Sequence, residues 1–272
     1  MFISTNGITY YVEVVGEGRP IVFLHGFTGN SASWHQPTKM IKNEFQCVFI
    51  DLIGHGKTDS PADTSRYQIE KVAKDIIHIL NVLNISQTHL VGYSMGGRVA
   101  LATSILYPSR ISSLILESSS PGLRTDEERR NRRHSDELLA RRIEQDGIEA
   151  FINYWESIPL FASQKKLAIE KQLLVRKQRL GNNPVGLANS LRGMGTGVQP
   201  SYWERLCELN FPLLLLCGKL DQKFCRIAKE MCTNLPNAKM EKIINAGHAI
   251  HVEQPQFFGK IINEFVSDHN TQ

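Results

Sequence analysis

The stretch Leu90-Val91-Gly92-Tyr93-Ser94-Met95-Gly96-Gly97-Arg98-Val99 decides how the rest of the chain is interpreted. An apolar run, Thr88 to Val91, leads into Gly-x-Ser-x-Gly, and a helix-like run, Arg98 to Leu106, leads out. This order predicts a strand, a tight turn and a helix, with Ser94 at the apex of the turn. Such a turn strains the serine backbone, so the residues two before and two after it must be glycine-sized. We therefore expect the Ser94 hydroxyl to stand clear of a sheet, with helix N-terminal amides behind it.

Length and composition place the chain among globular α/β proteins. Its 272 residues, 42% of them hydrophobic and 21% charged, suit one large domain or two small ones. The first seven residues lack the basic lead and apolar run of a signal peptide. No apolar stretch approaches the roughly 20 residues that a membrane helix needs. We expect a cytoplasmic protein without membrane insertion.

The cysteines predict reduced thiols in such a compartment, because they are odd in number and show no paired metal-ligand spacing. They are Cys47, Cys207, Cys217, Cys225 and Cys232. Cys217 ends an apolar run, and we expect it to pack in the core.

The excess positive charge lies in one segment. Residues 121–195 hold 14 Lys and Arg against 10 Asp and Glu, whereas the remainder of the chain holds 17 of each. The arginines there alternate with acids, and aromatic residues that could stack on bases are few, which disfavours nucleic acid as a partner. A small anionic substrate fits this charge better.

Apolar runs alternate along the chain with segments whose apolar residues recur at helical spacing. Ile8 to Val15 alternates and precedes Gly16-Glu17-Gly18, which predicts an early antiparallel strand. The other predicted strands are Pro20–Leu24, Cys47–Ile50, Thr88–Val91, Ile111–Glu117, Phe211–Cys217 and Ala238–Ile244. The predicted helices are Ser31 to about Lys42 with Ser31 as its cap, Ile69–Leu83, Arg98–Leu106, Gln222–Asn234 and His251–Val266.

Strand-like runs stop between Pro121 and about Gly195. Charged helical segments, separated by Gly and Pro, take their place at Asp126–Gln145, Gly147–Trp155 and Gln164–Leu180. A glycine-rich stretch, 193–197, is predicted to be a flexible return, and the alternation of strands and helices resumes with Ser201–Glu208.

The order of elements predicts a mostly parallel central sheet flanked by helices, with a helical cap inserted after the strand that follows the Ser94 strand. We expect residues 1–120 and 196–272 to form the core domain and residues 121–195 to form the cap. Ligand sites in open α/β sheets lie at the carboxyl ends of the strands. A cap leaving from that edge would cover the site and turn its arginines toward whatever Ser94 acts on.

A catalytic serine needs a base, and the base needs an acid that orients it. Asp221 follows the predicted strand that ends at Cys217, and His248 follows the strand that ends at Ile244. Both are expected at the sheet edge that holds Ser94, in the chain order Ser, Asp, His of the α/β-hydrolase fold.

Other acidic and histidine side chains are alternatives. Glu117 ends the strand after the serine helix and could also reach a histidine, while Asp51 is expected to order its own loop. His251 is expected on the helix that follows His248. We expect the side chain of His25 to hydrogen-bond the backbone of its own loop.

Negative charge that develops on a substrate oxygen needs hydrogen-bond donors. Geometry favours the backbone amides of Met95, directly after Ser94, and of Phe27 in the loop His25-Gly26-Phe27. Neither His-Glu-x-x-His nor Gly-x-x-x-x-Gly-Lys-Ser/Thr occurs. We therefore predict neither a metal ion nor a cofactor.

With these residues in place, the chain resembles the α/β-hydrolase fold superfamily over nearly its whole length. That resemblance is carried by His25-Gly26-Phe27, Asp51-Leu52-Ile53-Gly54-His55-Gly56, Gly92-Tyr93-Ser94-Met95-Gly96-Gly97, Asp221 and Gly247-His248. The chain also looks like the 2-succinyl-6-hydroxy-2,4-cyclohexadiene-1-carboxylate synthases of menaquinone biosynthesis. That narrower resemblance is carried by Phe23-Leu24-His25-Gly26-Phe27-Thr28-Gly29, Gly92-Tyr93-Ser94-Met95-Gly96-Gly97-Arg98, Ser120-Pro121-Gly122-Leu123, Arg132 and Phe151-Ile152-Asn153-Tyr154-Trp155.

The synthase family uses the hydrolase triad to expel pyruvate from an enolpyruvyl-bearing cyclohexene, without hydrolysis. The resemblance therefore implies that Ser94, activated by His248 and Asp221, abstracts a proton from the substrate ring. It implies a small polycarboxylate as the substrate, and we expect a monomer or weak homo-oligomer.

The same resemblance implies which residues bind that substrate. Arg98 on the serine helix and the cap residues Arg132 and Arg179 match arginines that hold carboxylates, and Tyr93 and Trp155 match aromatic residues of the pocket. Arginine forks bind carboxylates bidentately, which agrees with this assignment. For the remaining arginines between residues 124 and 142 we expect solvated helix faces: Arg124, Arg129, Arg130, Arg133, Arg141 and Arg142.

The triad alone leaves the reaction class open. The same three residues would serve an ester hydrolase or a carbon–carbon bond hydrolase. A non-catalytic ligand receptor built on this fold is a third hypothesis, which the complete set of Ser94, Asp221 and His248 disfavours. The arginines and the narrower resemblance favour the lyase.

Overall fold

A computed structural model of the chain describes residues 1–41 and 44–269. It contains an eight-stranded sheet in the order β1-β2-β4-β3-β5-β6-β7-β8. The strands are β1 (Phe2–Thr5), β2 (Ile8–Val15), β3 (Arg19–Leu24), β4 (Phe45–Ile50), β5 (Thr88–Tyr93), β6 (Ile111–Glu117), β7 (Leu213–Gly218) and β8 (Ala238–Ile243). β2 pairs antiparallel with β1 and β4, and every pairing from β4 to β8 is parallel.

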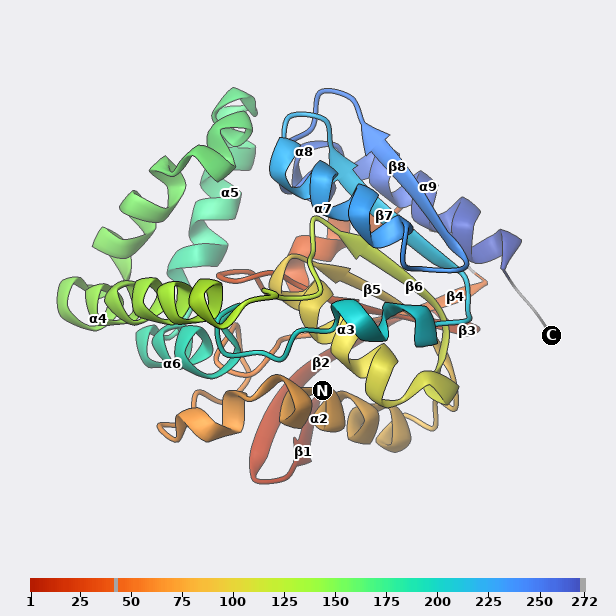
Figure 1. Cartoon of the computed structure of the whole chain (residues 1–272), viewed down its shortest axis with the longest axis horizontal. Coiled ribbons are helices and arrows are strands. Elements are labelled where there is room, and N and C mark those ends of the chain that lie inside the picture. The colour runs from red at the N-terminus through yellow and green to blue at the C-terminus, as the bar shows by residue number, and fades with distance from the viewer. Residues whose placement is uncertain (42–43, 270–272) are drawn as a thin grey trace.

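Helices cover both faces of this sheet (Figure 1). The helices of the core are α1 (His35–Thr38), α2 (Ile69–Val82), α3 (Met95–Leu106), α7 (Gln222–Cys232), α8 (Ile250–Glu253) and α9 (Pro255–Asp268). Alternate strand residues point to opposite faces. Val22 and Leu24 of β3 therefore join the hydrophobic cluster of α2 and α3, whereas Ile21 and Phe23 join the cluster of Trp34 and α9.

The segment between β6 and β7 forms a helical insertion. It contains α4 (Asp126–Ser157), the 3-10 segment η4 (Pro159–Lys166), α5 (Ile169–Leu180) and α6 (Pro184–Met194). These helices lie together on one side of the sheet (Figure 1). They enclose a small hydrophobic cluster of their own, and α4 bends at Gly147, where φ is 80°.

The insertion is joined to the core through α6 and the residues before it. The side-chain amide of Asn182 donates to the carbonyl of Thr28 (2.9 Å) and its oxygen accepts from the amide of Gly56 (3.0 Å). Gly54 and Gly186 approach so closely that a Cβ on Gly186 would lie 2.3 Å from the carbonyl oxygen of Gly54. The loop after β4 therefore packs directly against the insertion and is hydrogen-bonded to it.

The structure differs from the predicted elements in several places. The helix expected from Ser31 is a 3-10 turn, Ser31–Trp34, followed by the four residues of α1, and its cap is Asn30, whose side chain accepts from the amide of Ala32. The expected end at Lys42 lies outside the described residues. Proline at position 37 restricts the residue before it and removes a backbone donor, which disfavours a longer helix.

Two further differences, and one element whose type was not predicted, concern the second half of the chain. Residues 193 and 194, predicted to begin a return loop, belong to the end of α6. The segment Trp203–Glu208 is a 3-10 helix, η5. The helix predicted from His251 to Val266 divides into α8 and α9 at Gln254, because Pro255 begins the second helix.

No helix within the described ranges combines the length and apolar character needed to cross a membrane.

Candidate active site

Ser94 lies in the sharp turn between β5 and α3. Its backbone adopts φ 50° and ψ −107°, a left-handed conformation that is strained for a residue with a side chain. A Cβ on Gly92 would lie 2.6 Å from the carbonyl oxygen of Gly96, and a Cβ on Gly96 would lie 2.2 Å from the carbonyl oxygen of Leu24. The expected strand, turn and helix are confirmed, and so is the need for glycine on either side of the serine.

Two loops at the same sheet edge bring a histidine and an aspartate to this serine. The Oγ of Ser94 lies 3.0 Å from Nε2 of His248, and Nδ1 of His248 lies 2.6 Å from Oδ2 of Asp221. A carboxylate can only accept a hydrogen bond, so Nδ1 of His248 carries the proton that it donates to Asp221. Nε2 is then free to accept the proton of the Ser94 hydroxyl. The structure thus brings together the three residues selected from the sequence, in the geometry of a nucleophile, a base and an orienting acid.

Glu117, the alternative acid, has a different partner. Its carboxylate accepts from the backbone amide (3.1 Å) and from Nδ1 (2.8 Å) of His251, and both side chains are buried. The ring of Tyr93 lies between the two histidines, with its centroid 5.3 Å from that of His248 and 4.6 Å from that of His251. The Glu117–His251 pair therefore supports the floor of the site from below and does not orient His248.

The loops after β3 and β4 are held by their own side chains, as the sequence predicted for His25 and Asp51. Nδ1 of His25 donates to the carbonyl of Gly26 (2.8 Å), and its Nε2 accepts from the amide of Leu52 (3.0 Å). Burial lowers the pKa of His25 to about 4. Asp51 accepts from the amides of Ser31 and Lys57 (2.6 and 2.8 Å).

A cavity of about 270 Å³ opens above Ser94, between the sheet edge and the inserted helices. Its lining includes most of the residues predicted for the site: Phe27, Tyr93, Ser94, Met95, Arg98, Arg132, Trp155 and His248. The indole Nε1 of Trp155 is buried and has no hydrogen-bond partner within the described part of the chain. The cavity therefore combines apolar walls, an unused donor and two guanidinium groups.

Arg98 and Arg132 place positive charge in this cavity. Arg98 donates to the carbonyl of Met194 and to Oε1 of Gln199, and burial, reinforced by the neighbouring Arg132, lowers the pKa of Arg98 to about 10. Arg132 donates from Nε to Oδ1 of Asp136 (2.8 Å). The two guanidinium groups thus give this cavity donors of the kind that pair with carboxylates.

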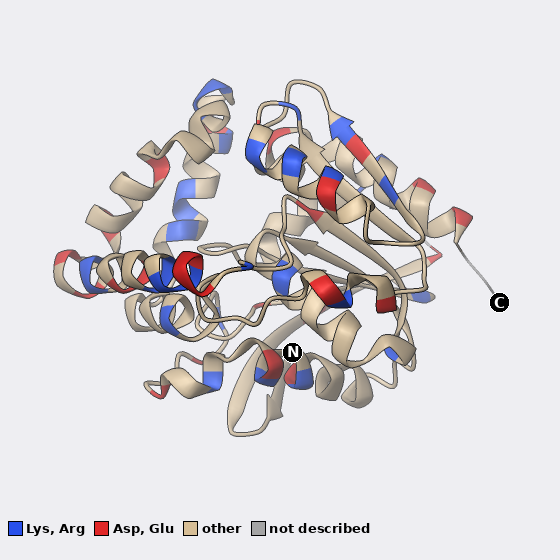
Figure 2. Cartoon of the chain, viewed as in Figure 1, with Lys and Arg blue, Asp and Glu red and all other residues tan. Residues whose placement is uncertain are grey.

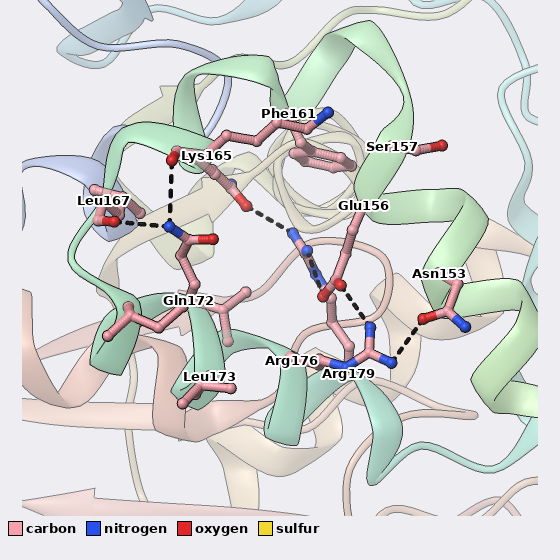
Figure 3. Close-up of a pocket in the computed structure, with 13 residues that line it drawn as sticks. Asn153, Glu156, Ser157, Phe161, Lys165, Leu167, Gln172, Leu173, Arg176 and Arg179 are labelled. Atoms are coloured by element: carbon pink, nitrogen blue, oxygen red, sulfur yellow. Dashed lines mark hydrogen bonds and ion pairs between the residues drawn. The ribbon is translucent and has the colours of Figure 1, made fainter.

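Arg179 occupies a different place from the other predicted arginines. Its NH1 lies 3.1 Å from Glu156 and its NH2 donates to Gln164 (2.9 Å), in a neighbouring cavity formed by the end of α4, η4 and α5 (Figure 3). Arg176 donates to the other oxygen of Glu156 (2.7 Å). Phe161 lines both cavities and separates Arg179 from Ser94. The structure therefore does not bring Arg179 to the serine cavity.

Most of the other arginines of the insertion contact protein groups. Acidic and basic residues are interleaved along α4, as Figure 2 shows. Arg141 pairs with Glu137 and Arg142 with Asp146, both one turn away on the exposed side of α4. Arg124 lies over the ring of Trp203.

Two aromatic residues of the site were not selected from the sequence. Phe224 lies in the first turn of α7 with its ring centroid 4.6 Å from that of His248, and Phe161 in η4 lies 6.2 Å from it. The position of Phe224, three residues after Asp221 at a helix start, is a signal that could have indicated it. Phe161 has no such signal, because its place depends on how the insertion folds over the core.

Across residues 1–41 and 44–269, no three His, Cys, Asp or Glu side chains are grouped so that they could hold a metal ion.

The sheet order, the serine turn and the hydrogen-bonded Ser94, His248 and Asp221 define a protein of the α/β-hydrolase fold. A family model described as the alpha/beta hydrolase fold matches residues 19–255. The chain is also 46% identical, over 97% of its length, to a Bacillus subtilis (strain 168) protein, and 34% identical, over 86% of its length and 88% of the relative's, to the 2-succinyl-6-hydroxy-2,4-cyclohexadiene-1-carboxylate synthase of Citrobacter koseri. It belongs to that synthase family.

Solved structures show the same relationship. The structure of MenH from S. aureus matches with a TM-score of 0.92 at 38% identity, covering 96% of this chain and 99% of that one. A thermophilic esterase from Thermogutta terrifontis matches with a TM-score of 0.87 at 28% identity, covering 99% and 97%.

Proposed function

We propose that this chain eliminates pyruvate from 2-succinyl-5-enolpyruvyl-6-hydroxy-3-cyclohexene-1-carboxylate and releases 2-succinyl-6-hydroxy-2,4-cyclohexadiene-1-carboxylate, a step of menaquinone biosynthesis. The observation that carries the proposal is the position of Arg98 and Arg132 in the same cavity as the hydrogen-bonded Ser94 and His248. The substrate carries three carboxylates, and guanidinium groups bind carboxylates with charge-assisted hydrogen bonds. The membership of the synthase family agrees with this substrate.

The reaction begins with the ring proton next to the succinyl ketone. His248 takes the hydroxyl proton of Ser94 at Nε2, and the Ser94 oxygen takes the proton from the ring carbon. The electron pair of that C–H bond forms a double bond to the next ring carbon, the existing ring double bond shifts by one position, and the bond to the enolpyruvyl oxygen breaks. The leaving enolate of pyruvate takes the proton held by His248 and converts to the keto form, so the histidine is restored and no water is consumed.

Charge that develops on the ketone oxygen requires donors close to Ser94. Phe27 and Met95 line the cavity beside Ser94, and their backbone amides are the donors in this proposal. Tyr93 and Trp155 form the walls that exclude water. Arg98 and Arg132 hold substrate carboxylates, and Arg179 joins them only if Phe161 moves aside.

The insertion has a defined part in this proposal. Residues 121–195 form the cap, with residues 1–120 and 196–272 as the core domain, because the insertion contributes Arg132 and Trp155 to the cavity while the sheet edge contributes Ser94 and His248. The proposal also includes a cytoplasmic location, which the five free thiols fit because that compartment is reducing. It further includes a monomer or a weak homo-oligomer. Cell fractionation and analytical ultracentrifugation test these two points.

Pyruvate release tests the reaction. The substrate is supplied to the purified protein, and pyruvate is followed by a coupled lactate dehydrogenase assay. We expect Ser94→Ala to lose at least about 10³-fold in kcat, because a triad acts as a unit, and to keep substrate binding. Ser109→Ala, a change at an exposed serine in the turn before β6, is the matched control and should retain full activity. Retained turnover in Ser94→Ala would refute Ser94 as the base.

Ester hydrolysis is the second candidate function. It is favoured by the complete triad geometry and by the structural likeness to the thermophilic esterase. A hydrolase would turn over p-nitrophenyl acetate through an acyl group on Ser94, which mass spectrometry detects after a rapid acid quench. Fast ester turnover without pyruvate release would assign the chain to the hydrolases.

A further inference from the structure

Two cysteines flank the loop that carries Asp221. Cys217 lies at the end of β7, four residues before Asp221, and Cys225 lies in α7, four residues after it. Their Sγ atoms are 3.0 Å apart, which is closer than unbonded sulfur atoms ordinarily approach. Cys217 is fully buried, whereas Cys225 is partly exposed. A small oxidant can therefore reach one sulfur of a pair whose other member is already in contact with it.

The first turn of α7 is bonded directly to Asp221. The amide of Cys225 donates to the backbone carbonyl of Asp221 (3.0 Å), and the amide of Phe224 donates to its Oδ1 (3.2 Å). The other carboxylate oxygen, Oδ2, holds Nδ1 of His248. The ring of Phe224 also packs on His248. A movement of Cys225 toward Cys217 therefore moves the groups that position the histidine.

We propose that Cys217 and Cys225 are a redox modification site, at which hydrogen peroxide forms a reversible disulfide that displaces Asp221 from His248. This inference rests on the proposed role of Asp221 as the acid of the triad. In the overall reaction, two thiols and one molecule of hydrogen peroxide give one disulfide and two molecules of water. Both sulfurs are oxidised and both peroxide oxygens are reduced.

The order of the two steps follows from burial. The Cys225 sulfur attacks one peroxide oxygen, the O–O bond breaks, and a sulfenic acid and one water form. The Cys217 sulfur then attacks the Cys225 sulfur, and the hydroxyl leaves as the second water. Cys217 reacts second because burial raises the pKa of its thiol and excludes the oxidant.

The expected effect follows from the change in distance. A disulfide holds its sulfurs about 2.05 Å apart, so the two Sγ atoms must approach by about 1 Å, and we expect the start of α7 to move toward the end of β7. A displacement of that size at a catalytic group costs about 100-fold in rate. We therefore expect the oxidised protein to be about 100-fold slower, and reduction to restore it.

The experiment treats the full-length protein with hydrogen peroxide, then unfolds it in N-ethylmaleimide and measures intact mass. The reduced protein should take up five maleimides, one for each cysteine, and the oxidised protein two fewer. Peptide mapping should give a crosslinked peptide that contains both Cys217 and Cys225. The low-field proton signal of Nδ1 of His248 should shift on oxidation, and pyruvate release should fall and return with dithiothreitol.

Cys225→Ser and Cys232→Ser are matched variants, because both change a partly exposed cysteine of α7. Cys225→Ser should resist peroxide, and Cys232→Ser should behave like the unaltered protein. Absence of the crosslink, a crosslink without a shift of the His248 signal, or equal peroxide inactivation of Cys225→Ser would each overturn the inference. The intact mass and the His248 proton signal can be measured without any enzymatic turnover. A failure of the reduced protein to release pyruvate would therefore count against the proposed function alone.

Discussion

The sheet edge and the inserted helices contribute to one cavity by different means. At the sheet edge, Ser94, Asp221 and His248 each follow a parallel strand, and each has a partner within 3.0 Å. In the insertion, most arginines are paired with protein groups, and Arg132 is the cap arginine that lines the serine cavity. In the proposed reaction, the first region carries out the proton transfer and the second contributes a group that holds the substrate.

This difference explains why a triad leaves the reaction class open. The same strand ends support lyases and esterases, since their chemistry begins with the same serine and histidine. In the proposed reaction, substrate selection would depend on Arg132, whose position is set by the packing of α4 on α6 and its following residues. Changes in the two regions should therefore have different kinetic signatures.

The largest expected difference in kcat is between variants of two buried carboxylates of the core, Asp221 and Glu117. Asp221→Asn should lower kcat by about 10⁴-fold with little change in Tm, because the amide no longer selects the tautomer with a free Nε2. Glu117→Gln should leave kcat near its original value and cost about 1–3 kcal/mol of stability, because His251 loses a buried partner. Steady-state kinetics and thermal unfolding measure both. An equal loss of kcat in the two variants would show that Glu117 also serves the base.

The next effect concerns the stability of the core at low pH. Burial lowers the pKa of His25 from its ordinary 6.5 to about 4, so the unfolded chain takes up a proton that the folded protein does not. The free energy of unfolding should therefore be at its highest above pH 6.5 and fall as the pH drops toward 4, by about 3 kcal/mol for this group. Urea unfolding across this range measures the loss. His25→Gln should give a shallower dependence, and an unchanged slope would contradict the assignment.

A third effect tests the selectivity of the insertion. Arg132→Met should lower kcat/KM by about 10–100-fold, because one charge-assisted contact to a carboxylate is lost. Arg141→Met is the matched control, since Arg141 lies on the same helix and bonds only Glu137 among the contacts described. Equal losses in both variants would show that the cap acts through its overall charge, as would a strong salt dependence shared by both.

The smallest effect should come from the ion pairs that join α6 to α4. Arg192 bonds Glu137 and Glu144, and its hydrogen bonds lower the pKa of Glu137 to about 2. These groups are partly exposed to solvent, so Arg192→Gln should cost about 1 kcal/mol or less. Thermal unfolding at low and high salt measures this, with kcat unchanged. A large loss of activity would mean that this contact sets the position of the cap.

Much of the core could be predicted because its signals are local. β5, β6 and β7 are apolar runs bounded by glycine or by polar loops, and the Gly-x-Ser-x-Gly turn can be satisfied only by small residues at fixed positions. The positions of Asp221 and His248 follow from the parallel direction of the strands that precede them. The short α1 could not be predicted from apolar spacing, because Pro37 lies within it and limits its length.

The insertion could be predicted as helical but not in its contacts. Its charges permit many pairings, and the position of Arg179 depends on Glu156, 23 residues earlier in the chain. α6 is buried on several sides, so it lacks the periodic polar face by which a surface helix is identified. The contact between Cys217 and Cys225 likewise arises from the angle at which α7 packs on β7.

The bend at Gly147 separates the half of α4 that bears Arg132 from the half that bears Trp155. A Cβ at this position would meet nothing within 4 Å, so the constraint is the left-handed backbone alone. A substitution at Gly147 can therefore change the angle between the two halves of α4 without a steric clash at the new side chain's Cβ. The size of acceptable substrates can change in this lineage while every residue of the sheet stays the same.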